Sequence, residues 1–177
     1  LNSEKFLHEK YQEPNTSTPF LVGELAEYLY LNRPYLKSRN LDVDQVANQL
    51  SQWLQTQEGI HRAYTRNQIM EGGNEDPLIK LYKEGFDPQR CGEILLVQKP
   101  YWLFGKGTGT SHGTPYPYDT HVPLMILGNG AKKLNSDERI TPLYIAPMIA
   151  RELGIPQPAG CTIQLPPLTK PVSIDGR

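Results

Sequence analysis

The sequence contains little cysteine, no excess charge of either sign and no long apolar run. Only Cys91 and Cys161 are cysteines, and their separation fits neither a zinc ribbon nor a redox pair. They therefore form either a disulfide or two unrelated buried thiols. The formal net charge is -1, from 18 basic and 19 acidic residues, so nothing indicates a nucleic-acid partner. No run of about 18 apolar residues is present, so we expect no membrane-spanning helix.

The composition is that of a globular protein with a real core. Of the 177 residues, 38% are hydrophobic and 21% are charged. A chain of this length can bury a single hydrophobic core. It begins with Leu1 rather than methionine, so we expect the natural N-terminus to lie upstream.

The first half of the sequence predicts a strand, a helix and a second strand. Aromatic and aliphatic residues alternate over 28–31, which is typical of a strand. A helix is predicted from Val43 to Leu54, with Asp42 as its cap, because its apolar residues recur at spacings of three and four. Gly59 stands where a left-handed residue would end that helix. The next strand is predicted at 60–64.

The second half predicts two buried strands and a helix. A strand is predicted over 93–104, and its continuous apolar run indicates that both faces are covered. A second short apolar strand is predicted at 122–127. A helix follows at 145–153, and Gly154 is expected to end it. Strands that alternate with helices in this way predict an α/β fold.

Between the two apolar strands lies a loop that carries the candidate chemistry. Residues 107–124 read GTGTSHGTPYPYDTHVPL. The glycines around His112 allow the backbone to turn sharply and to bring an imidazole close to a metal or phosphate. Imidazole is a common zinc ligand. His112 is thus either a metal ligand or a loop residue that makes hydrogen bonds.

The neighbouring polar residues leave alternatives open. His112 and His121 could form a two-histidine site, although nine residues is not a standard ligand spacing. The other interpretation of His121 is that it starts the strand and satisfies a buried neighbour. Asp119 either orients a histidine or belongs to a turn. Ser111 has no nucleophile elbow around it, so no catalytic nucleophile is predicted in this chain.

This loop resembles one family closely. The stretch GTSHGTPYPYDTHVPLMILGNG, followed by YIAPMIA at 144–150, is similar to the alkaline phosphatase superfamily, in the branch allied to type I phosphodiesterases and nucleotide pyrophosphatases. GEILLVQKPYWLF, IHRAYTR and YLYLN also resemble stretches of that family. The likeness covers roughly residues 25–168.

The resemblance implies a fold and a division of the chain. It implies the C-terminal part of an alkaline-phosphatase-like three-layer α/β/α sandwich with an α+β cap-like subdomain. Residues 1–90 would be the cap-like or insertion subdomain, and 91–177 the part of the core that carries the histidine loop. Tyr144 replaces the family's usual Asp before Ile-Ala-Pro, so the following helix is expected to lack a side-chain cap. Thr114 and Cys91 replace two family serines.

The resemblance also implies a chemistry. It places a zinc ligand on His112 and none on His121, in an enzyme that holds two zinc ions and a Thr or Ser nucleophile. The nucleophile and the other ligands lie upstream in the family, so we expect these 177 residues alone to be inactive on a phosphate ester. The family is usually exported, which implies a periplasmic or secreted protein.

Two other functions are compatible with the sequence. The chain could be a stable non-catalytic module that acts as a cap or binds a partner. It could instead belong to a sulfatase or phosphonate hydrolase of the same superfamily. In each case we expect exposed apolar edges that allow self-association.

Overall fold

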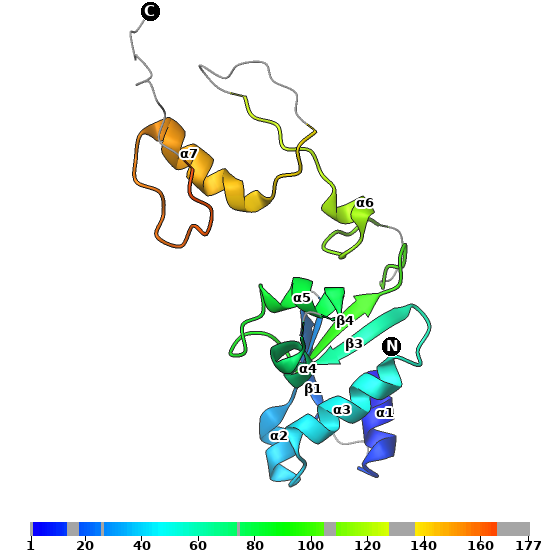
Figure 1. Cartoon of the computed structure of the whole chain (residues 1–177). Helices are drawn as coiled ribbons and strands as arrows, with labels where there is room; N and C mark the ends of the chain where they lie inside the picture. Colours follow the sequence, from blue (N-terminus) through cyan, green and yellow to red (C-terminus); the bar gives the residue numbers. More distant parts are fainter. Residues whose placement is uncertain are drawn as a thin grey trace, which may run out of the picture. The chain divides into compact units, whose positions relative to one another are not determined.

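The computed structural model describes residues 2–13, 18–25, 27–73, 75–104, 109–127 and 137–165. Contacts within the chain divide it into two units, Leu1–Leu124 and Met125–Arg177, which are described separately (Figure 1).

The first unit is built on an antiparallel sheet of four strands. They are β1 (Leu21–Leu25), β2 (Tyr28–Leu31), β3 (Ile60–Thr65) and β4 (Ile94–Gln98). Their order in the sheet is β1-β2-β4-β3, so β4 lies between two strands that precede it in the sequence. Leu95 of β4 pairs with Tyr28 on one side and with Tyr64 on the other. The last described strand, β4, therefore joins the β1-β2 hairpin to β3.

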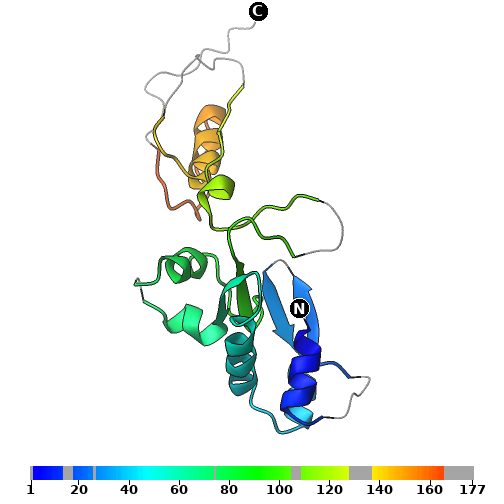
Figure 2. The same ribbon diagram turned by 90° about the vertical axis from the view of Figure 1, so that its right-hand side faces the viewer.

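Helices cover both faces of this sheet (Figures 1 and 2). Three helices pack on one face: α1 (Ser3–Lys10), α2 (Arg33–Ser38) and α3 (Val43–Leu54). Two short helices pack on the other: α4 (Arg66–Glu71) and α5 (Pro77–Lys83). Successive residues of β4 enter the two cores in turn, with Ile94 and Leu96 on the first face and Leu95 and Val97 on the second. The prediction of a strand covered on both faces is confirmed.

The predicted strand–helix–strand unit is also confirmed. The Asp42 side chain accepts a hydrogen bond from the Gln45 backbone N–H at 2.8 Å and so caps α3. The prediction for Gly59 was wrong, because α3 ends at Leu54 and its C-cap is Gln55. Gly59, with φ +84°, instead lies in the turn before β3, where an added Cβ would stand 2.4 Å from the Trp102 ring.

The strand predicted at 93–104 is shorter than expected. It ends at Gln98, because the chain turns at the next residues and the Trp102 N–H donates to the Lys99 carbonyl at 3.1 Å. Pro100 has no N–H with which to continue the ladder. Tyr101 then adopts φ +64°, which takes the chain out of the strand direction.

The strand predicted at 122–127 does not form. Most side chains of this apolar segment are exposed: Val122 at 67%, Leu124 at 42%, Met125 at 86%, Ile126 at 60% and Leu127 at 101%. No strand in the described parts of the chain pairs with it. An apolar sequence alone makes no sheet, because the backbone also needs a hydrogen-bonding neighbour.

The second unit contains one clear helix. The 3-10 turn η1 (Pro142–Tyr144) leads into α7 (Ile145–Leu153), which Gly154 ends with φ +65°, as predicted. Tyr144 makes no side-chain cap bond, which confirms the expected loss of that cap. The chain from 155 to 165 has no regular structure. None of the described helices has the length and apolar character needed to cross a bilayer.

The architecture is thus a mixed α/β fold, in agreement with the predicted class. Cys91 and Cys161 are free thiols, each half-buried rather than fully buried. The division into a cap-like part at 1–90 and a core part at 91–177 stays a prediction. In the structure β4, from the second of these parts, is an inner strand of a sheet whose other strands come from the first.

Candidate functional site

The loop that carries His112 returns to the end of β4. The Tyr116 hydroxyl donates a hydrogen bond to the carbonyl of Gln98, the last residue of β4. One helical turn, α6 (Pro117–Thr120), follows directly and is drawn beyond the end of β4 in Figure 1. The candidate site is thus anchored on the inner strand of the sheet.

His112 itself is exposed on this loop. The next residue, Gly113, has φ +98°, in the left-handed region that favours glycine, and open space surrounds the position of an added Cβ. No described residue makes a hydrogen bond with the His112 ring. The assignment of His112 as a metal ligand stays a prediction.

Asp119 fixes the backbone beside His112. Its carboxylate accepts a hydrogen bond from the Thr114 N–H at 2.6 Å. This bond, with a smaller contribution from the nearby His112 ring, lowers the pKa of the Asp119 carboxyl below its usual range. Of the two roles predicted for Asp119, the structure supports the turn, because its hydrogen bond goes to the backbone rather than to a histidine.

The other histidines do not join His112. His121 is exposed and ends α6, so the prediction that it starts a strand beside a buried neighbour was wrong. His8 lies 3.5 Å from Glu4 and packs edge-on against Phe20. His61 is half-buried in β3. Among the residues that the structure describes, no three His, Cys, Asp or Glu side chains gather closely enough to hold a metal ion.

Tyr101 is a member of the site that the sequence prediction missed. Its ring stacks on Tyr118 at a centroid distance of 4.7 Å, and Tyr118 stacks on Tyr116 at 5.7 Å. The sequence signal was Lys99-Pro100-Tyr101-Trp102, which places Pro second in a tight turn of type I or type II, and only the type II turn has positive φ at the third position. A non-glycine residue there costs about 1–2 kcal/mol.

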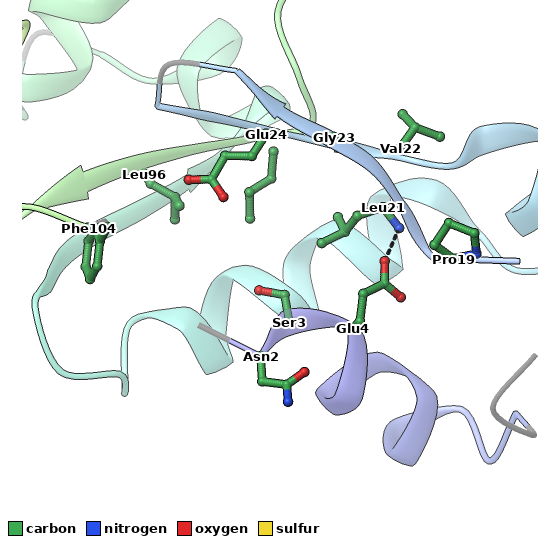
Figure 3. Close-up of a pocket in the computed structure, with 11 residues that line it drawn as sticks. Asn2, Ser3, Glu4, Pro19, Leu21, Val22, Gly23, Glu24, Leu96 and Phe104 are labelled. Carbon is green, nitrogen blue, oxygen red and sulfur yellow. Dashed lines mark hydrogen bonds between the residues drawn. The ribbon is translucent and has the colours of Figure 1, made fainter. Parts of the chain in front are cut away.

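A hollow of about 450 Å³ lies elsewhere in the first unit, between α1 and β1. Figure 3 shows Glu4 hydrogen-bonded to the Leu21 backbone, with Glu24 and Phe104 further along the hollow. Two carboxylates in its lining would repel an anionic phosphate ester. We therefore do not assign the phosphate chemistry to this hollow.

Comparison with known proteins finds relatives that are named either as a calcium-transporting ATPase or as an alkaline phosphatase. It is 31% identical over 143 residues to a calcium-transporting ATPase of Myroides odoratus, an alignment that covers 79% of this chain and 26% of that protein. It is 24% identical over 157 residues to the alkaline phosphatase PafA of Elizabethkingia meningoseptica, covering 88% and 29%. A third relative, the alkaline phosphatase PhoV of Synechococcus elongatus, is 30% identical over 76 residues, covering 43% and 14%. No family model matches the sequence.

The fold is that of a solved phosphatase. The crystal structure of wild-type alkaline phosphatase PafA matches with a TM-score of 0.78 at 24% identity, over 94% of this chain and 31% of that one. The chain thus spans less than a third of the length of that protein. The shared fold and the similarity to two alkaline phosphatases support membership of the alkaline phosphatase superfamily.

Proposed function

We propose that this chain forms part of a zinc-dependent hydrolase of phosphate esters, acting on monoesters or diesters, in which His112 is one zinc ligand. The observation that carries the proposal is the exposed, unpaired imidazole of His112 on a loop anchored to an inner strand, in a chain with the alkaline phosphatase fold. The relatives are named as a phosphatase and an ATPase, and both names denote enzymes that cleave a phosphate ester or anhydride. The family resemblance further supports a periplasmic or secreted protein.

The residues present fit one part of a zinc site. A catalytic zinc needs about three protein ligands, and His112 is the ligand that this chain would contribute. The remaining ligands and the nucleophile would come from polypeptide outside these 177 residues, since the chain spans only 26% and 29% of two relatives. Bound zinc would stabilise negative charge on the phosphoryl oxygens. The chain's own contribution is to hold the His112 ring in place.

Replacement of His112 tests the proposal. In a longer protein that contains this chain, we expect His112→Ala to weaken zinc binding by at least about 100-fold, because loss of a direct ligand should exceed the 10- to 100-fold effect of a supporting group. Metal content after dialysis, measured by mass spectrometry, and hydrolysis of an aryl phosphate are the two readouts. The 177-residue chain by itself should show no turnover in that assay.

The matched control is His121→Ala, which removes a second exposed imidazole near the same loop. It should leave zinc content and turnover close to those of the unmodified protein. If His112→Ala kept its zinc and activity, the ligand assignment would be wrong, and a non-catalytic role for this chain would become the better explanation.

We also propose that the isolated chain self-associates through the apolar segment 122–127. Its five large apolar side chains, at 122 and 124–127, are exposed at 42–101%, and such contiguous apolar surface favours association. Sedimentation velocity should show a mass that rises with concentration. Ile126→Lys should reduce that rise, whereas Leu81→Lys, at an apolar residue exposed at 52% on α5, should not. A monomer at every concentration would contradict the proposal.

A further inference from the structure

We propose that the stack of Tyr101, Tyr118 and Tyr116 is a positioning device that holds the His112 loop against the end of β4. The three rings lie at centroid distances of 4.7 Å and 5.7 Å, in planes inclined by 22° and 26°. The stack joins the turn after β4 to the segment that follows His112. As a statement about metal binding, the inference rests on the proposed role of His112 as a zinc ligand.

The backbone of Tyr101 is the first reason to assign it a role. The turn Lys99–Trp102 has Pro100 in second place and Tyr101 in third, with φ +64°. A type II turn prefers glycine or asparagine at that position, because a side chain there is strained. Such a conformation persists where surrounding contacts enforce it, and it often marks a functional site.

Core packing does not account for Tyr101, because its side chain is 85% exposed. Its described contacts are both with Tyr118. The rings stack, and the Tyr101 backbone N–H donates to the Tyr118 hydroxyl at 3.1 Å. These contacts of the strained Tyr101 therefore connect the turn after β4 to the loop that carries His112.

From Tyr118 the connection reaches His112 in two steps. Tyr118 and Asp119 are neighbours in α6, and the Asp119 carboxylate accepts the Thr114 N–H at 2.6 Å. Thr114 lies two residues after His112. On the other side of the stack, the Tyr116 hydroxyl donates to the Gln98 carbonyl, so the loop is tied to both the strand and the turn that follows it.

A metal-ligating residue on an exposed loop needs contacts that hold the loop in one position. If the loop were free, zinc binding would have to order several residues, and each ordered residue lowers the affinity through lost backbone entropy. Groups that orient a metal ligand commonly change metal affinity by 10- to 100-fold. Loss of the stack should therefore weaken zinc binding without unfolding the sheet.

The variant Tyr101→Gly separates positioning from stability. Glycine suits the turn, so the urea midpoint of the 177-residue chain should stay within the error of the unmodified chain or rise, while the stack is lost. In a longer protein that contains this chain, affinity for zinc, measured by competition with a chromophoric chelator, should fall about 10- to 100-fold. Tyr101→Phe keeps the ring and the backbone N–H, so it should bind zinc within about twofold of the unmodified protein.

A measurement without metal keeps the two proposals distinguishable. In the zinc-free 177-residue chain, Tyr101→Gly should speed hydrogen exchange at the Thr114 amide, and Tyr101→Phe should not.

If His112→Ala removes zinc but Tyr101→Gly changes neither the hydrogen exchange nor the zinc affinity, the positioning role is wrong and the zinc proposal stands. If Tyr101→Gly lowers the urea midpoint together with the affinity, the residue is merely structural and the inference is overturned. If His112→Ala leaves zinc bound, the zinc proposal fails, and Thr114 exchange still decides whether the stack holds the loop.

Discussion

Glu93→Ala should lower the free energy of unfolding of the first unit by about 3 kcal/mol, the lower end of the cost of removing one partner from a buried ion pair, because the Arg33 side chain is 53% exposed. The Glu93 side chain, directly before β4, is 6% exposed. Its carboxylate accepts the Leu31 backbone N–H at 2.7 Å and lies 2.6 Å from Arg33 and 3.4 Å from Arg66. One side chain thus joins the end of β2 to the first turns of α2 and α4.

The cost should come mainly from the groups that Glu93 leaves behind. The Leu31 N–H would be buried without an acceptor, and Arg66, with its side chain 17% exposed, would lose its carboxylate partner. Urea unfolding followed by circular dichroism measures the effect. Glu9→Ala is the control, because its pair with Lys5 is about two-thirds exposed on both sides and should contribute less than about 1 kcal/mol. Equal effects of the two variants would contradict this account of Glu93.

Gly92→Ala should be the second strongly destabilising change, by about 3 kcal/mol, near the upper end of the usual cost of overpacking. A Cβ at Gly92 would stand 2.3 Å from the Leu29 carbonyl oxygen, which belongs to the backbone of β2. The strand cannot move this oxygen aside without disturbing its pairing with β4, in which Tyr28 lies opposite Leu95 and Leu29 opposite Ile94.

Gly23→Ala is the matched control for Gly92→Ala. Gly23 lies in strand β1, and an added Cβ there would meet nothing within 4 Å. The alanine should be neutral or stabilise the chain by up to about 1 kcal/mol, because glycine loses more backbone freedom on folding. The same urea experiment compares the two. If Gly92→Ala proved as mild as Gly23→Ala, close packing of β2 against β4 would not explain this glycine.

Glu93 and Gly92 affect the candidate site through strand β4. Glu93 and Gly92 determine where β4 enters the sheet, and Gln98 at its other end accepts the Tyr116 hydroxyl that anchors the His112 loop. A strand with both faces buried moves little, so it gives an exposed loop a fixed base. We therefore expect the rigidity of the proposed site to depend on packing several residues away from His112.

The regular elements with strong local signals were predictable. The spacing of apolar residues and the Asp42 cap predicted α3, and Gly154 predicted the end of α7. Burial of β4 on both faces followed from its continuous apolar run. The motif around His112 indicated the family, and the shared fold agrees with it.

The failures at Gly59 and at the end of β4 were local, whereas the others involve partners that are distant in sequence. Residues 122–127 have the composition of a strand, yet no described strand pairs with them. The sequence also gave no indication that Glu93 would meet Arg33, which lies 60 residues away. The importance of Tyr101 depends on a ring 17 positions further along the chain.

By itself, the sequence determined the α/β class and the main helix and strands, and it carried the resemblance to the alkaline phosphatase superfamily, since these depend on periodicity, caps and a local motif. Only the tertiary structure decided the strand order, the burial of Glu93 and the attachment of the His112 loop to β4. The physical reason is that hydrogen bonds and ring contacts between distant segments depend on how the chain packs, which no local pattern encodes.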